Sequence, residues 1–257
     1  MDFHIEDHGT GPAILFIHAG VADSRMWRDQ LGLSGYRTIA FDKRGFGRTP
    51  WVPRPYSDTE DCLAVLDYLG VESAIMVGCS MGGATAVDLA VNHADRVDAL
   101  VLVGAFPSGW EPPGGFEDTP LEQEAADAAE ARDYDLVVDI DYRMWLVGYG
   151  RDELAVDPAH KILFYDMDAR PVRNEAERQE YHMGRGTPIN ERLDDIDVPA
   201  LVVVGAHDEP VLLEAAGYMA ARLGETEAVI VPGAAHLPSL EQPGEFNRLL
   251  GAFLDAI

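Results

Sequence analysis

Cysteine is scarce in this sequence, and its scarcity excludes two ways of stabilising a fold. Cys62 and Cys79 are the only cysteines among 257 residues. Two cysteines cannot form the disulfide framework of a small secreted protein, and neither lies in a Cys-x-x-Cys pair, so structural zinc is not expected. Stability must come from an apolar core, which a chain of this length with 47% hydrophobic residues can supply.

Basic residues are few as well. The chain has 19 Lys and Arg against 45 Asp and Glu, which gives a formal net charge of -26. A surface of this sign repels phosphate groups, so neither nucleic acid nor an anionic membrane is expected as a partner. The carboxylates do not follow the spacing of a calcium loop, and the histidines do not have metal-ligand spacing, so no metal is expected.

Long hydrophobic runs are also missing. The first apolar run covers residues 13–17, whereas a membrane-spanning helix needs about 20 apolar residues. Residues 1–7 carry acidic side chains where a secretion signal carries basic ones. Both observations predict a cytoplasmic protein.

Short β-branched runs alternate with helical stretches along most of the chain. This alternation is typical of βαβ units and predicts an α/β fold with a mainly parallel sheet. The runs are almost continuously apolar, as expected when helices cover both faces of the sheet. The predicted strands are 13–18, 37–42, 73–79, 98–104, 200–205 and 227–232, with an antiparallel edge strand at 3–6. The predicted helices are 57–69, 81–93, 209–223 and 243–256.

The alternation is interrupted once, between residues 104 and 200. This gap is too long for a bare loop, so we predict a helical cap insertion at 107–195 and a core made of 1–106 and 196–257. Thr119 and Glu122 have the spacing of a capping box for the first helix of the insertion. Further helices are predicted at 134–147, 159–168 and 173–183. The insertion holds 22 acidic and 9 basic residues, so its net charge of -13 is half that of the chain.

The strongest local signal for chemistry is the segment Gly78-Cys79-Ser80-Met81-Gly82-Gly83, which follows a predicted strand and precedes a predicted helix. A serine in so sharp a strand-to-helix turn needs small residues two positions before and after it, and Gly78 and Gly82 meet that need. The turn exposes the hydroxyl above the sheet, and the next amide lies at a helix N-terminus, where it can stabilise an oxyanion.

A serine hydroxyl needs a base, and the base needs a carboxylate that orients it. His236 follows the last predicted strand, and Asp208 follows the strand 200–205. Asp208 could also be only the N-cap of the helix that begins at Pro210. The order Ser80, Asp208, His236 is nevertheless the nucleophile, acid, base order of one hydrolase architecture, and each residue follows a strand.

With these residues in place, the chain resembles the α/β-hydrolase superfamily over nearly its full length. His18-Ala19-Gly20 is similar to the family's His-Gly-x oxyanion loop, with Ala19 in place of the usual glycine. The resemblance implies that the amides of Gly20 and Met81 form an oxyanion hole, with Val21 as the alternative to Gly20. Residues 42–49 resemble the family's Asp-x-Arg-Gly-x-Gly-x-Ser/Thr loop, and 240–243 resemble its helix start after the histidine. We interpret both segments, including Asp42, Arg44 and Glu241, as structural.

The nucleophile narrows the expected reaction. Haloalkane dehalogenases and epoxide hydrolases of this fold have an aspartate as the nucleophile in the strand-to-helix turn, whereas this chain has Ser80 there. The expectation is therefore a serine esterase or lactonase that acts through an acyl-enzyme. The acidic insertion favours a small neutral substrate over a polyanion. C–C bond hydrolysis, cofactor-free perhydrolysis and slow or non-hydrolytic ligand binding stay open as alternatives.

The substrate pocket is expected between the strand ends and the insertion, without a cofactor. The predicted lining consists of large apolar residues near loops or in the insertion: Trp27, Phe106, Trp110, Trp145, Tyr149 and Leu237. A small molecule is the expected partner, and the sequence leaves open whether the protein forms a homodimer.

Overall fold

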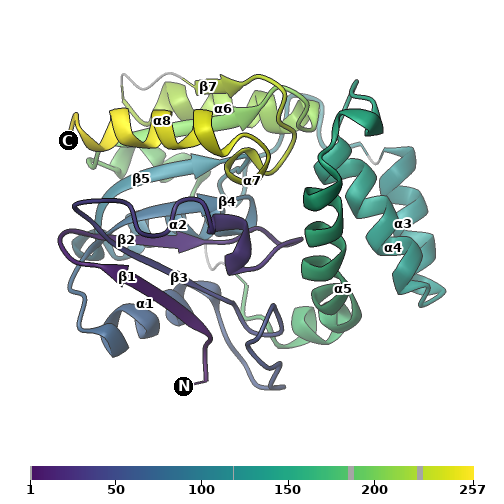
Figure 1. Ribbon diagram of the computed structural model, residues 1–257, viewed down its shortest axis with the longest axis horizontal. Coiled ribbons are helices and arrows are strands. Elements are labelled where there is room, and N and C mark those ends of the chain that lie inside the picture. The colour runs from purple at the N-terminus through teal and green to yellow at the C-terminus, as the bar shows by residue number, and fades with distance from the viewer. Residues whose placement is uncertain (1, 118, 185–187, 225–227) are drawn as a thin grey trace.

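The computed structural model describes residues 2–117, 119–184, 188–224 and 228–257. These residues form a seven-stranded sheet in the order β1-β3-β2-β4-β5-β6-β7 (Figure 1). Only β1 is antiparallel to its neighbour, and the other neighbouring strands pair in parallel. The bounds are β1 Ile5–Gly9, β2 Ala13–Ile17, β3 Arg37–Phe41, β4 Ala74–Cys79, β5 Val97–Val103, β6 Ala200–Gly205 and β7 Ala228–Val231. The mainly parallel α/β sheet predicted from the sequence is confirmed; residue 227 of the predicted last strand lies outside the described residues.

Two apolar layers cover the sheet, one on each face. On one face, α1 (Asp58–Leu69), α2 (Met81–Asn92) and α6 (Pro210–Arg222) bury residues such as Leu66, Val87 and Met219. On the other, a short 3₁₀ turn (Ser24–Trp27), α7 (Pro238–Glu241) and α8 (Pro243–Leu254) bury Trp27 and Phe246. Because both faces are covered, the central strands have no polar face, which explains their continuous apolar runs.

Local signals in the sequence start and stop several helices. The Ser57 hydroxyl accepts a hydrogen bond from the Glu60 amide at 3.2 Å, and Gly70 ends α1 in the left-handed conformation with φ 65°. Thr119 and Glu122 form the predicted capping box at the start of α3 (Pro120–Glu130). Each contact satisfies amide groups that a helix end leaves without an intrahelical partner.

Helices inserted between β5 and β6 lie at one end of the sheet (Figure 1). They are α3, α4 (Tyr134–Asp141), a π-helical turn (Tyr142–Val147) and α5 (Pro158–Tyr181). The prediction of separate helices at 159–168 and 173–183 is wrong, because α5 continues through Pro171. Phe164, Met167 and Val172 on both sides of the proline are buried. Their packing offsets the backbone hydrogen bond that proline cannot donate.

No helix in the described ranges is long and apolar enough to cross a membrane. Within the same part of the chain, no three His, Cys, Asp or Glu side chains are grouped so that they could hold a metal ion.

Candidate active site

Ser80 occupies the sharp turn between β4 and α2. Its backbone has φ 54° and ψ -117°, a left-handed conformation that a residue with a side chain adopts only at a cost of about 1–3 kcal/mol. The turn also requires glycine on both sides. A Cβ atom on Gly78 would lie 2.3 Å from the Gly82 carbonyl oxygen, and one on Gly82 would lie 2.2 Å from the Ile17 carbonyl oxygen. The strand-to-helix turn predicted from the glycine spacing is therefore present.

His236 and Asp208 are in direct contact although 28 residues separate them. The His236 Nδ1 donates to the Asp208 carboxylate, with distances of 2.9 and 3.0 Å to its two oxygens. Both residues are 2% exposed. Asp208 Oδ1 also accepts a hydrogen bond from the Glu209 amide at 2.9 Å. Glu209, not Asp208, is the N-cap residue of α6, so Asp208 does not serve merely as a helix cap.

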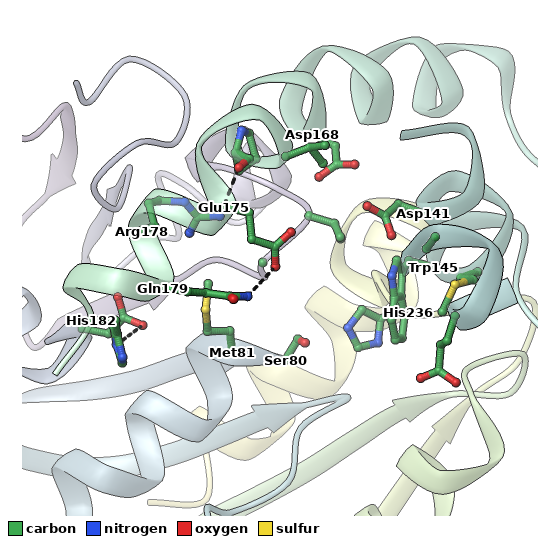
Figure 2. Close-up of a pocket in the computed structure, with 18 of the residues that line it drawn as sticks. Ser80, Met81, Asp141, Trp145, Asp168, Glu175, Arg178, Gln179, His182 and His236 are labelled. Carbon is green, nitrogen blue, oxygen red and sulfur yellow. Dashed lines mark hydrogen bonds and ion pairs between the residues drawn. The ribbon is translucent and has the colours of Figure 1, made fainter. Parts of the chain in front are cut away.

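A pocket of about 670 Å³ lies between the strand ends and the inserted helices. Ser80 and His236 both line it, and Figure 2 shows the Ser80 hydroxyl directed toward the side where His236 lies. Gly20, Val21 and Met81 line the same pocket. The predicted nucleophile, base and oxyanion-loop residues thus share one cavity, and Asp208 lies behind the base.

The comparisons with known proteins agree with this geometry. A model of the Alpha/beta hydrolase family matches residues 14–249. This chain belongs to the alpha/beta hydrolase family. The resemblance drawn from the sequence motifs is thereby confirmed, and the fold is the α/β-hydrolase fold.

Several relatives of this hydrolase cover almost the whole chain. The 3-oxoadipate enol-lactonase 1 of Acinetobacter baylyi is 26% identical, over 96% of this chain and 90% of the relative. A 2-hydroxy-6-oxononadienedioate/2-hydroxy-6-oxononatrienedioate hydrolase of Comamonas testosteroni is 25% identical, over 98% of this chain and 90% of the relative. The crystal structure of an enol-lactonase from Burkholderia xenovorans LB400 has a TM-score of 0.80 at 23% identity, with 98% of this chain and 96% of that chain covered. At that identity the likeness shows the fold alone.

Trp145, on the π-helical turn of the insertion, packs against His236. The two ring centroids are 4.6 Å apart, and the His236 amide donates to the Trp145 carbonyl oxygen at 3.1 Å. Trp145 is the one member of the predicted pocket lining that lines this hydrolase's pocket. The insertion therefore contacts His236 directly.

The structure places the other five predicted lining residues elsewhere. Trp27 and Leu237 are fully buried in the core on the α8 side of the sheet. Phe106 and Trp110 pack against each other, and Trp110 also packs against Tyr218 of α6. Tyr149 lies near Glu209, to which its hydroxyl donates at 3.4 Å. Size and position near a loop did not separate these side chains from pocket residues, because aromatic groups fill cores equally well.

The loop that carries His236 is held by a buried ion pair whose role sequence reasoning did not find. The Glu241 carboxylate accepts hydrogen bonds from the Ala235 and Leu237 amides at 3.0 and 3.1 Å, on both sides of His236. Arg151 of the insertion contacts Glu241 at 2.5 Å and donates to the Gly233 carbonyl oxygen at 2.6 Å. Both side chains are less than a tenth exposed. Glu241 was identified as structural, but only the fold brings Arg151 to it.

His18, next to the predicted oxyanion loop, is a structural histidine. Its Nδ1 donates to the Ala19 carbonyl oxygen at 2.7 Å, and its Nε2 accepts from the Lys43 amide at 2.9 Å. Burial, with nearby Lys43, lowers the pKa of His18 to about 3, so the ring is neutral at pH 7. Asp42 accepts from the Ser24 amide at 2.9 Å and the Arg48 amide at 2.7 Å. The 42–49 loop thus holds His18 of the predicted oxyanion loop through the Lys43 amide. This agrees with our interpretation of the 42–49 loop as structural.

Sequence reasoning also missed acidic side chains in the pocket. Asp141 at the end of α4 and Asp168 on α5 line the cavity that Ser80 and His236 line. Burial raises the pKa of Asp141 to about 6. Burial and the neighbouring Asp141 raise the pKa of Asp168 well above its usual range. The acidity of the insertion was visible in the sequence, but which carboxyl groups face inward depends on how α4 and α5 pack.

Proposed function

We propose that this protein is a serine hydrolase that cleaves a small neutral ester or lactone through an acyl-enzyme. The observation that supports this most strongly is the buried His236–Asp208 pair, joined at 2.9 Å, in a pocket that Ser80 also lines. Membership of the hydrolase family supports the same reaction class. The similarity to the Acinetobacter baylyi enol-lactonase agrees with it.

In the proposed mechanism, the Ser80 oxygen attacks the substrate carbonyl while His236 takes the serine proton. Asp208, hydrogen-bonded to Nδ1, keeps the other ring nitrogen free to accept that proton and stabilises the imidazolium that forms. The amides of Met81 and Gly20 hold the oxyanion, and the Met81 amide gains from its place at the start of α2. His236 then protonates the leaving group and activates the water that releases the acyl group.

The same residues would serve the alternatives. C–C bond hydrolysis is favoured by one observation, the similarity to the Comamonas testosteroni hydrolase. Perhydrolysis, and slow or non-hydrolytic ligand binding, use the same pocket. We still predict a small-molecule substrate and a cytoplasmic location. We also still predict that the protein uses no cofactor and binds neither nucleic acid nor a membrane. Whether it forms a homodimer stays open.

Covalent labelling tests the nucleophile. A fluorophosphonate probe should modify the native protein at Ser80, and peptide mass spectrometry would identify the site. Ser80→Ala should lose labelling and lower the turnover of short p-nitrophenyl esters at least about 10³-fold, because the residual rate comes only from binding and the oxyanion hole. Ser34→Ala, at an exposed turn serine, is the control and should keep both. Labelling at another residue, or full activity of Ser80→Ala, would refute the proposed function.

A further inference from the structure

The wall of the pocket opposite Ser80 contains two carboxyl groups that face each other. Figure 2 shows Asp141 and Asp168 with their carboxyl groups directed toward one another, above Ser80 and His236. Asp168 is 1% exposed, yet no hydrogen-bond donor among the described residues reaches its Oδ2 atom. A buried carboxylate oxygen without a donor is costly, so this wall is incomplete without a proton or a bound group.

Charged neighbours alter how readily Asp141 and Asp168 ionise. Glu175 raises the pKa of both carboxyl groups, whereas Arg178 opposes this for Asp168. Hydrogen bonds from Trp145 and from Asp168 favour the ionised form of Asp141. Two facing carboxyl groups cannot both be ionised at low cost, so they share one proton and keep one negative charge near neutral pH. Lone pairs are left over for a donor that comes from a ligand.

We propose that Asp141 and Asp168 form a subsite that binds a hydrogen-bond donor of the substrate, a hydroxyl or an amine. The inference rests on the proposed function for the reaction and narrows its substrate to an ester or lactone that carries such a donor away from the reacting carbonyl. A hydroxyl donor keeps that substrate neutral, whereas an amine donor would make it cationic. Trp145 connects the carboxyl pair to the side of the pocket that holds Ser80 and His236, since it contacts both Asp141 and the His236 ring. A donor bound at the pair would therefore position the ester beside the base.

Among the described residues that line the pocket, Arg178 carries a positive charge, which would favour an anionic substrate. Its guanidinium lies over the Phe46 ring at 4.3 Å and donates to the Pro171 carbonyl oxygen at 3.3 Å. In Figure 2 it lies toward His182, away from Trp145 and His236. A carboxylate bound at the Asp141–Asp168 pair would meet like charge.

Binding to a protein that cannot turn over tests the subsite directly. Ser80→Ala would be titrated calorimetrically with matched ester series that end in a hydroxyl, ammonium, methoxy or carboxylate group, placed on the acyl or the alcohol side at increasing chain length. The hydroxyl or ammonium ester of one series should bind about tenfold or more tightly than its methoxy analogue, because the donor reaches an ionised acceptor. An equal affinity for hydroxyl, ammonium and methoxy esters in both series, or tightest binding of the carboxylate, would overturn the proposal.

Substitutions then locate the preference. Adding Asp141→Asn and Asp168→Asn to Ser80→Ala removes the charge with little change in size and should lower the preference to below about threefold. Asp127→Asn in the same background removes an exposed charge of α3 outside the pocket lining and should leave the preference within about twofold. A preference that survives the double Asn change would assign it to another part of the pocket and refute the subsite.

Turnover separates this proposal from the proposed function. With Ser80 restored, native protein should show a higher kcat/KM on the donor ester than on the methoxy ester, through a lower KM. In the double Asn variant the ratio of the two kcat/KM values should fall to below about threefold. If native protein binds donor esters preferentially but hydrolyses none, the serine mechanism fails and the subsite stands. If it hydrolyses all esters without preference, the subsite fails and the mechanism stands.

Discussion

The pocket has two sides that are built differently. Its floor, which we define as Ser80, Asp208 and His236 with the amides of Gly20 and Met81, is made by loops at the ends of sheet strands. Its roof, defined as Asp141, Trp145 and Asp168, is made by the inserted helices. In the floor, the Asp208 carboxylate accepts from His236 and from the Glu209 amide. In the roof, Asp168 Oδ2 lacks a donor among the residues described.

This difference separates reaction type from substrate choice. Parallel strands end at the same edge of a sheet, and β4 and β6, which precede Ser80 and Asp208, are each hydrogen-bonded to strands on both sides. The backbone of the sheet therefore fixes these two floor residues. The roof depends on the packing of α4 and α5, and its charged pair needs an additional proton or ligand. We infer that the floor determines which bond is attacked and the roof determines which molecules are held there.

The largest effect should come from the floor. Asp208→Asn keeps the size of the side chain but no longer favours the correct His236 tautomer, so kcat should fall about 10³–10⁴-fold with little change in KM. Steady-state kinetics on a p-nitrophenyl ester would measure this. Asp98→Asn, at an exposed residue of β5, is the matched control and should keep native activity. A loss below about tenfold would mean that Asp208 does not orient the base.

The connection between floor and roof should have an intermediate effect. Glu241→Gln leaves the buried Arg151 without its carboxylate and weakens the contacts on both sides of His236, so the free energy of unfolding should fall by about 3–5 kcal/mol. Urea denaturation would measure it, and kcat should fall more than KM rises.

Glu245→Gln provides the comparison, because it breaks the exposed pair with Arg248 on α8. Its effect on stability should be much smaller, since exposed ion pairs are screened by water. Equal effects of the two substitutions would show that the Arg151–Glu241 pair does not hold the base loop.

The smallest effect concerns the pH dependence of the roof. The pKa of Asp141 is raised to about 6 and that of Asp168 is also raised, so the folded state binds protons more tightly than the unfolded state. Stability from this pair therefore increases as the pH falls through about 6, and it levels off below the ordinary carboxyl range. The double change Asp141→Asn and Asp168→Asn should raise the melting temperature more at pH 8 than at pH 5. An identical difference at both pH values would contradict the raised pKa values.

Particular residues show which features of the structure the sequence patterns predicted correctly and which they did not. Gly78 and Gly82 predicted the turn at Ser80 because a side chain at either position would overlap with backbone atoms. The Thr119 capping box predicted the start of α3 because its contacts lie within four residues. Pro171 led to the wrong prediction of two separate helices, because packing of distant side chains outweighs the local preference of proline against helix.

The sequence by itself determined the order of strands and helices along the chain and the strained serine turn, and it singled out Asp208 and His236 as candidates, because these depend on local backbone geometry and on the order of residues. Only the tertiary structure decided that Trp145 rests on His236, that Arg151 reaches Glu241 and that Asp141 faces Asp168. Those contacts join segments whose separation along the chain carries no periodic signal. They exist because the inserted helices pack over the end of the sheet where the Ser80 turn lies.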